Sequence, residues 1–65
     1  MNYLVIGVGK DNLNQEIGEF KANSDGEAYY TFWKEYASNL RFPDYDLILY
    51  RVGLLGKKIF ITSDY

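Results

Sequence analysis

The stretch Ser24-Asp25-Gly26-Glu27 has the form of a helix capping box, and it is followed by an apolar stripe that ends at Leu40. In such a box the Ser24 hydroxyl accepts a hydrogen bond from the backbone N–H of Glu27, and the Glu27 carboxylate accepts one from the N–H of Ser24. No second stretch of the chain has this form. The sequence therefore predicts one helix, which divides 65 residues into two flanks of similar length.

The predicted helix has one wide aromatic side and ends before a proline. The residue before a proline avoids helical backbone angles, so Phe42-Pro43 closes the helix. Asp25 and Glu27 in the first turn and Arg41 just past the last turn suit the helix dipole. We expect the large rings of the apolar stripe to belong to the core. The stripe consists of Asp25, Ala28, Tyr29, Phe32, Trp33, Tyr36 and Leu40.

Each flank has the pattern of two strands. Residues 3–8 are β-branched and apolar, whereas residues 15–22 are more polar, with Gly18 marking a bulge or bend. Residues 45–52 and 57–62 have the composition of a second pair of strands. The predicted order of elements is therefore ββαββ.

This order predicts a single α+β domain over residues 1–65, with one helix packed on one face of a four-stranded sheet. The helix is long enough to carry the chain across the sheet, so strands one and four can pair in parallel at the centre. We favour this β-grasp-like order, 2-1-4-3, because strands one and four are the most apolar. An antiparallel meander with the helix on one face is the alternative.

The composition excludes several kinds of site. The chain has no cysteine and no histidine, which removes disulfides, thiolate metal sites, the usual zinc ligand and the usual general base near neutral pH. A hydroxyl such as that of Ser24 or Ser63 therefore has no base to activate it. The net charge is −2 and the basic residues are scattered, which argues against non-specific coating of DNA. We expect no enzymatic activity, no cofactor and no metal.

The sequence shows no sign of a membrane span or an export signal. The longest apolar run, Leu4 to Val8, is far too short to cross a bilayer. Asn2 and Tyr3 do not form the basic region of a signal peptide. We therefore expect a soluble cytoplasmic protein without a membrane partner.

One helix covers one face of the sheet, yet strands one, three and four carry apolar side chains on both faces. Three interpretations compete: self-association into a homodimer, binding of a protein partner, and stacking of single-stranded nucleic acid. For nucleic acid, the rings of Tyr50 and Phe60 would stack on bases. The neighbouring cations Arg51, Lys57 and Lys58 would bind phosphates. The residues expected on the uncovered face are Tyr3, Val5, Ile48, Tyr50, Val52 and Phe60.

Three short motifs each have two explanations. Gly7-x-Gly9 follows a strand, but the third glycine of a dinucleotide fingerprint is missing, so the two glycines more simply ease a hairpin. Asp44 and Asp46 would suit Mg²⁺ or Ca²⁺, although solvated acids at the entrance of a strand explain them better. Leu54-Leu55 at a hairpin tip either folds back over the sheet edge or is a contact point of a protein interface.

Several segments have the spacing of one viral protein family. They are Phe20 to Ala28, Phe32, Pro43 to Leu47, and Tyr50 to Gly53. Over residues 18–56 the chain thereby resembles the small non-structural protein of gokushovirus-type microviruses. The resemblance implies an early phage protein tied to single-stranded DNA replication or packaging, with DNA binding as its usual assignment. The hairpin tip, often acidic in that family, is Leu54-Leu55 here.

The leading hypothesis is a small, non-enzymatic phage accessory protein of the host cytoplasm. It would bind single-stranded nucleic acid or the replication machinery through the uncovered sheet face. One alternative is an acidic interaction module that inhibits a host enzyme, and another is a homodimeric structural component. The acidic residues that would face a basic partner are Asp11, Glu16, Glu19, Asp44 and Asp46.

Overall fold

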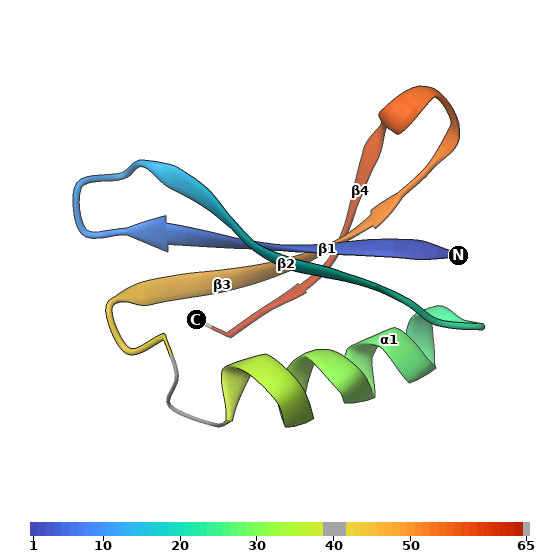
Figure 1. The fold of residues 1–65 in the computed structure, drawn as a ribbon, viewed down its shortest axis with the longest axis horizontal. Coiled ribbons are helices and arrows are strands. Elements are labelled where there is room, and N and C mark those ends of the chain that lie inside the picture. Colours follow the sequence, from blue (N-terminus) through green and yellow to red (C-terminus); the bar gives the residue numbers. More distant parts are fainter. Residues whose placement is uncertain (39–41, 65) are drawn as a thin grey trace.

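The computed structural model describes residues 1–38 and 42–64. Within these ranges the chain folds as predicted in the order ββαββ, with one helix lying across one face of a four-stranded sheet (Figure 1). The α+β class is therefore confirmed. The elements are β1 (Asn2–Gly9), β2 (Asn14–Lys21), α1 (Asp25–Phe32), a π-helical turn η1 (Trp33–Ala37), β3 (Tyr45–Val52), a 3-10 turn η2 (Leu54–Gly56) and β4 (Lys58–Ser63).

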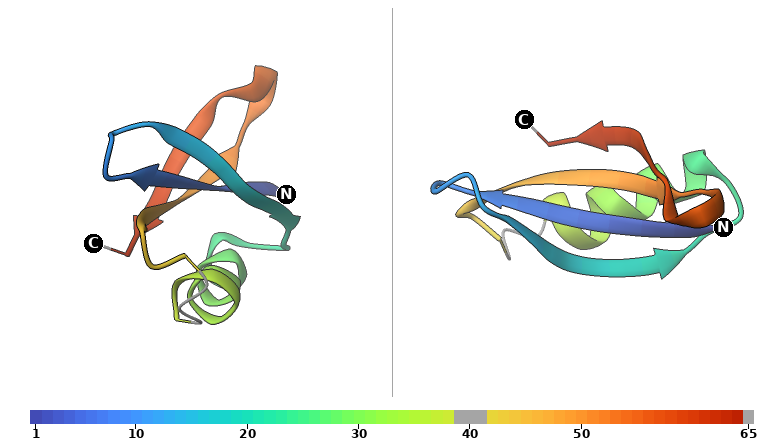
Figure 2. Two further views of the ribbon diagram at one scale, coloured as in Figure 1. Left: turned by 60° about the vertical axis from the view of Figure 1, so that its left-hand side comes forward. Right: turned by 90° about the horizontal axis from the view of Figure 1, so that it is seen from above.

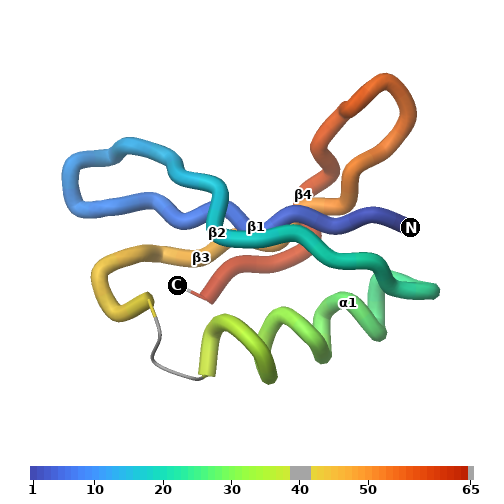
Figure 3. Tube along the Cα trace, viewed as in Figure 1, coloured from blue at the N-terminus to red at the C-terminus, as the bar shows by residue number. Residues whose placement is uncertain are grey.

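The order of the strands differs from the favoured one. The sheet has the order β2-β1-β3-β4, and its neighbouring strands all pair antiparallel. The β-grasp-like order is therefore wrong, and the meander was right about the antiparallel pairing but not about the sequence of strands. β3, whose Leu47 and Leu49 are buried, lies inside the sheet, whereas β4 lies at its edge and begins with an exposed lysine. The view from above shows β1 between β2 and β3 (Figure 2), and the tube view follows the path of the chain through the four strands (Figure 3).

The helix begins where the capping box predicts. Ser24 has extended backbone angles, and its Oγ accepts the N–H of Glu27 at 3.2 Å. The reciprocal bond is shifted by one residue, because Glu27 Oε1 accepts the N–H of Asn23 at 3.4 Å rather than that of Ser24. After Phe32 the helix widens into η1, where the N–H of Ser38 donates to the carbonyl of Trp33 at 2.9 Å. The predicted stripe residue Leu40 and the predicted dipole partner Arg41 lie outside the described residues.

A bulge in β2 confirms the expectation for Gly18. Val5 pairs with Gly18 but Ile6 pairs with Glu16, so Ile17 is the extra residue of the bulge. Ile17 packs against the core. Gly18 makes room for the helix, because a Cβ at this position would lie 2.7 Å from the hydroxyl of Tyr36.

The core lies between the sheet and the helix, on the lower side of the sheet in Figure 1. A column of stacked rings runs along one side of it, in the order Tyr3, Phe20, Tyr36 and Phe42, with centroids 5.7, 6.1 and 6.4 Å apart. Trp33 and Tyr36 pack against the core, as the stripe predicted. No helix among the described residues is long and apolar enough to cross a membrane. The buried residues of the cluster are Tyr3, Val5, Ala22, Ala28, Phe32, Leu47 and Leu49.

Candidate binding surface

The face of the sheet opposite α1 is largely apolar. Residues that pair directly across antiparallel strands lie on the same face. Leu4 pairs with Tyr50 and Tyr50 pairs with Phe60, so these three side chains form one row across the face. We call this surface the open face. Its apolar residues are Leu4, Ile6, Val8, Ile48, Tyr50, Val52 and Phe60.

Four of the six residues predicted on the uncovered face lie there, namely Ile48, Tyr50, Val52 and Phe60. The prediction is wrong for Tyr3 and Val5, which are 0% exposed beneath the helix. β1 is apolar at both parities, so alternation alone could not tell which set faces the helix. Their places on the open face are taken by Leu4, Ile6 and Val8.

The aromatic rings of the open face contact each other. The centroids of Tyr50 and Phe60 are 6.4 Å apart and their planes are at 78°, an edge-to-face arrangement. Phe60 keeps 60% of its surface exposed. A ring of this kind, on a face without a helix, is available to a partner.

The open face carries charges of both signs at its margins. At one end of the open face, Asn2 and Val52 pair with each other, and a lysine lies on either side of them. Lys21 pairs with Asn2, and Lys58 pairs with Val52. Glu16 and Glu19 lie on β2 opposite Ile6 and Leu4, and Asp46 lies opposite Val8. Among the described strand residues of this face, carboxylates therefore outnumber lysines, which does not favour a polyanion. Lys21 was missed by sequence reasoning because only the pairing register brings it beside Val52 and Lys58.

Arg51 does not lie on the open face, so its predicted role as a phosphate ligand beside Tyr50 and Phe60 is wrong. The two-residue period of β3 places it on the helix side with Leu49. There its Nη1 donates to Asp25 Oδ2 at 2.8 Å, and Asp25 Oδ1 accepts the hydroxyl of Tyr3 at 2.6 Å. Arg51 on β3 and Tyr3 on β1 thus together fix the first turn of α1 to the two central strands.

The contacts among Tyr3, Asp25 and Arg51 shift the pKa values of Tyr3 and Asp25. Burial, together with the hydrogen bond to Asp25, raises the pKa of Tyr3 to about 12. The Tyr3 hydroxyl and the Arg51 guanidinium hold the pKa of Asp25 below its usual range. Both shifts favour the arrangement seen, a neutral phenol donating to an ionised carboxylate.

The tip of the β3–β4 hairpin is apolar and fully accessible. Leu54 is 92% exposed and Leu55 is 106% exposed, so the tip does not fold back over the sheet edge. Leu55 has φ 60° and ψ 25°, the left-handed conformation that leucine rarely adopts, and it is followed by Gly56 with φ 76°. The lysines at positions 57 and 58 follow directly and are exposed. Figure 2 shows this hairpin rising on the side of the sheet away from α1.

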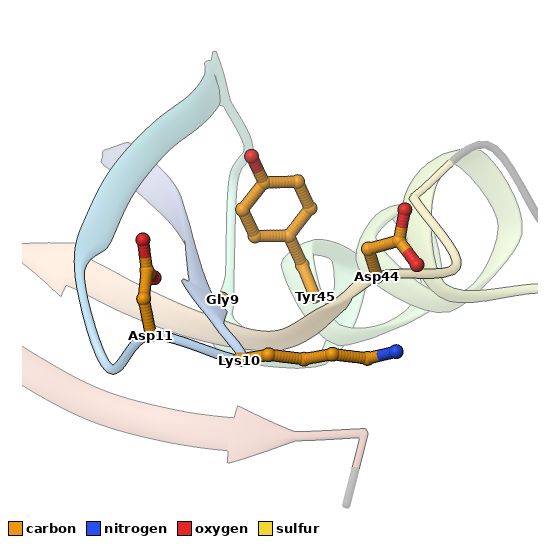
Figure 4. Close-up of a pocket in the computed structure, with 5 residues that line it drawn as sticks. All are labelled: Gly9, Lys10, Asp11, Asp44 and Tyr45. Carbon is orange, nitrogen blue, oxygen red and sulfur yellow. The ribbon is translucent and has the colours of Figure 1, made fainter.

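Hollows lie near the sheet in the described part of the chain, and two of them bear on the predicted sites. One of about 290 Å³ is lined by Gly9, Lys10, Asp11, Asp44 and Tyr45, and Figure 4 shows the Tyr45 ring standing between the two carboxylates. Two of its polar groups have structural partners: Asp11 Oδ1 accepts the N–H of Leu13 at 3.1 Å and the Tyr45 hydroxyl donates to Gln15 at 2.8 Å. Gly9 is the last residue of β1 and leads into the hairpin turn, where its carbonyl accepts the N–H of Asn12 at 2.9 Å.

The second hollow, of about 360 Å³, lies at the end of the open face where the β3–β4 hairpin begins. It is lined by Asn2, Glu19, Phe20, Lys21 and Val52. Its lining mixes apolar carbon with one acid and one base, and Val52 on its wall is the last residue of β3 before the hairpin turn. We call it the corner hollow.

The acidic residues proposed to face a basic partner do not form one cluster. Asp11 and Asp44 line the hollow at the β1–β2 turn, whereas Glu16, Glu19 and Asp46 border the open face. Within residues 1–38 and 42–64, no three acidic side chains come close enough together to hold a metal ion. Among the described residues, Asp44 and Asp46 therefore have no third carboxylate beside them to complete a metal site.

Comparisons with known proteins give no match: no family model, no curated protein and no solved structure is similar to this chain.

Proposed function

We propose that the chain is a non-catalytic protein-binding module whose contact surface is the open face. The observation that carries this proposal is the 60% exposed ring of Phe60, which lies in a row with half-buried Tyr50 and buried Leu4 on a sheet face that no described helix covers. A contiguous apolar patch on a small domain usually marks an interface. The carboxylates and lysines at its margin would form the polar rim of such an interface.

A second candidate is the binding of single-stranded nucleic acid on the same face. It is favoured by one observation, the presence of Tyr50, Phe60 and Lys58 together on neighbouring strands. Base stacking on exposed rings next to a cation is a common mode of single-strand binding. The engagement of Arg51 with Asp25 and the carboxylates at the margin favour the protein partner instead. The roles of a phage accessory protein and of a host-enzyme inhibitor rest on the sequence alone and stay predictions.

A peptide selection tests the first candidate. Random peptides displayed on phage are selected on the immobilised chain, and the recovered peptides are titrated against Phe60→Ser and Ile48→Thr. We expect apolar peptides whose affinity hardly depends on salt and falls about tenfold or more with either variant, because both remove contact area from the open face. Lys34→Ser is the control, since Lys34 is exposed on the helix beyond the core. Peptides that bind both open-face variants as tightly as wild type would contradict the proposal.

A titration with a labelled oligothymidine discriminates the second candidate. Nucleic-acid binding predicts affinity that falls steeply with salt and is weakened by Lys58→Gln and Phe60→Ser together. The protein-binding proposal predicts no saturable binding at micromolar protein concentration. Salt-dependent, saturable binding that is lost in Phe60→Ser would replace the first candidate with the second.

A further inference from the structure

We infer that the partner of the open face is a second copy of this chain, and that the tip residues Leu54 and Leu55 insert into the corner hollow of that copy. This inference rests on the proposed function, because it names the partner of the same surface. It is carried by three features of the described residues: the cost of the tip, the fit of the hollow, and the area of the open face.

The hydrogen-bonded turn itself uses a left-handed residue, but the choice of leucine for it has two costs that the hairpin does not explain. Leucine in the left-handed conformation is strained by about 1 kcal/mol or more compared with glycine, and Leu55 adopts this conformation. Leu54 and Leu55 are also almost wholly exposed to water. Features that break local rules without a structural gain are expected at functional sites. The tip is therefore built for contact with another surface.

The corner hollow has the chemistry and the position to receive this tip. Val52 supplies apolar contact for leucine, and of the two charged groups on the wall, Glu19 and Lys21, the Glu19 carboxylate suits the ammonium of Lys57. The tip and the hollow are neighbours on the same molecule, since Val52 ends β3 and Leu54 begins the turn. A twofold axis between them places each tip on the hollow of the other copy, which gives a closed, self-complementary pair.

The open face is too small to hold a stable dimer without the tip. Strands about 4.8 Å apart, three of about 26 Å and one of about 20 Å in length, offer about 480 Å² per copy. Two such faces bury about 960 Å² in total, whereas stable specific interfaces bury about 1,200 Å² or more. The hairpin rises on the same side of the sheet as the open face, so one partner can contact both (Figure 1). Adding two leucines from each copy brings the interface into the stable range.

The test is sedimentation of the whole chain over a wide concentration range. We expect a monomer–dimer equilibrium whose dissociation constant rises about tenfold or more in Leu54→Ser and in Leu55→Asn. Asn tolerates the left-handed conformation, so Leu55→Asn keeps the fold intact. Leu13→Ser is the matched control, because Leu13 is 68% exposed at the other hairpin and takes no part in the proposed contact. A dimer that weakens equally in all three variants, or in none, would overturn the role of the tip.

A spin label locates the contact. The chain has no cysteine, so Lys57→Cys provides a single attachment site beside the tip. Mixed with unlabelled ¹⁵N protein, the labelled copy is expected to broaden the amide signals of Asn2, Lys21 and Val52. Broadening confined to other residues, or a chain that stays monomeric at the highest concentration, would overturn the inference. If the monomer still binds selected peptides through Phe60, the proposed function stands and only the second copy fails.

Discussion

The hydroxyl of Tyr3 donates a 2.6 Å hydrogen bond to Asp25 Oδ1, which joins the central strand β1 to the first turn of α1. Arg51 binds the other carboxylate oxygen at 2.8 Å and adds the second central strand, β3. Three elements therefore meet at one carboxylate, and the stability of their junction depends on pH at both ends of the scale.

At acid pH the decisive group is Asp25. Its pKa is lowered mainly by the Tyr3 hydroxyl and then by Arg51, so the unfolded chain takes up a proton before the folded chain does. The stability that Asp25 contributes is present above its ordinary pKa and is lost as the pH falls through the lowered value. We expect Asp25→Asn to reduce the free energy of unfolding at pH 7 and to flatten its fall toward acid pH. Urea unfolding at a series of pH values measures this, and an unchanged acid slope would contradict it.

At alkaline pH the decisive group is Tyr3. Its pKa is raised from 10.0 to about 12, so the folded chain keeps a proton that the unfolded chain loses. Its contribution is complete below pH 10 and is lost as the pH rises toward 12. Tyr3→Phe should lower the free energy of unfolding at pH 7 by about 1–2 kcal/mol, through the lost hydrogen bond. It should also remove part of the alkaline fall. Tyr30→Phe is the control, since Tyr30 is 57% exposed on the helix.

Gly18 and Gly26 form a matched pair for an alanine test. A Cβ at position 18 would lie 2.7 Å from the Tyr36 hydroxyl, and the Tyr36 ring is held between Phe20 and Phe42. Gly18→Ala should therefore destabilise the fold by about 1–3 kcal/mol. Gly26 lies in the first turn of α1 with its nearest neighbour at 3.9 Å, so Gly26→Ala should stabilise by about 0.5–1 kcal/mol. Thermal unfolding of both variants is the measurement, and equal effects of the same sign would refute the assignment.

Ser24 caps the helix with a neutral hydroxyl. Ser24→Ala leaves the N–H of Glu27 without its acceptor and should cost about 1 kcal/mol of stability. Ser24→Asp keeps an acceptor and adds a favourable charge at the helix N-terminus, so it should retain or raise the stability. Helical circular dichroism and urea midpoints together report the difference. A neutral effect of Ser24→Ala would show that Glu27 and Asn23 hold the first turn unaided.

Replacing Leu55 with glycine should increase the stability of the monomer. In dilute solution Leu55→Gly is expected to raise the free energy of unfolding by about 0.5–1 kcal/mol, since glycine relieves the left-handed strain. Leu54→Gly is the control, because no positive φ occurs at that residue. Chemical unfolding at low micromolar protein measures the monomer. A loss of stability in Leu55→Gly would mean that the leucine side chain contributes to the fold itself.

The helix and its start could be predicted because capping is local chemistry: Ser24 and Glu27 contact residues within four positions of themselves. The order of the strands could not, because β3 and β4 are both apolar and only long-range packing selects which of them lies beside β1. The side of the sheet on which Tyr3 lies could not be predicted either, because both the odd and the even positions of β1 are apolar.

Arg51 is a different case. The alternation along β3 already separated Leu47 and Leu49 from Ile48 and Tyr50, and the same parity assigns Arg51 to the helix side. The prediction grouped Arg51 with Lys57 and Lys58 because the three lie close together in sequence, and this grouping was wrong. The contact with Asp25 itself had no sequence signal, because the two residues are 26 positions apart.

The pairing of β1 with β3 aligns Asn2 with Val52 and Gly9 with Tyr45, and it joins the β1–β2 hairpin to the β3–β4 hairpin along one seam. On either side of this seam lies one hairpin, and an isolated hairpin is at best marginally stable in water. A chain cut between α1 and β3 should therefore yield two fragments that are unstructured apart and regain the sheet when mixed. Assembly of the domain must wait until nearly all of it has been synthesised, since the final partner of the first strand is encoded some forty residues downstream.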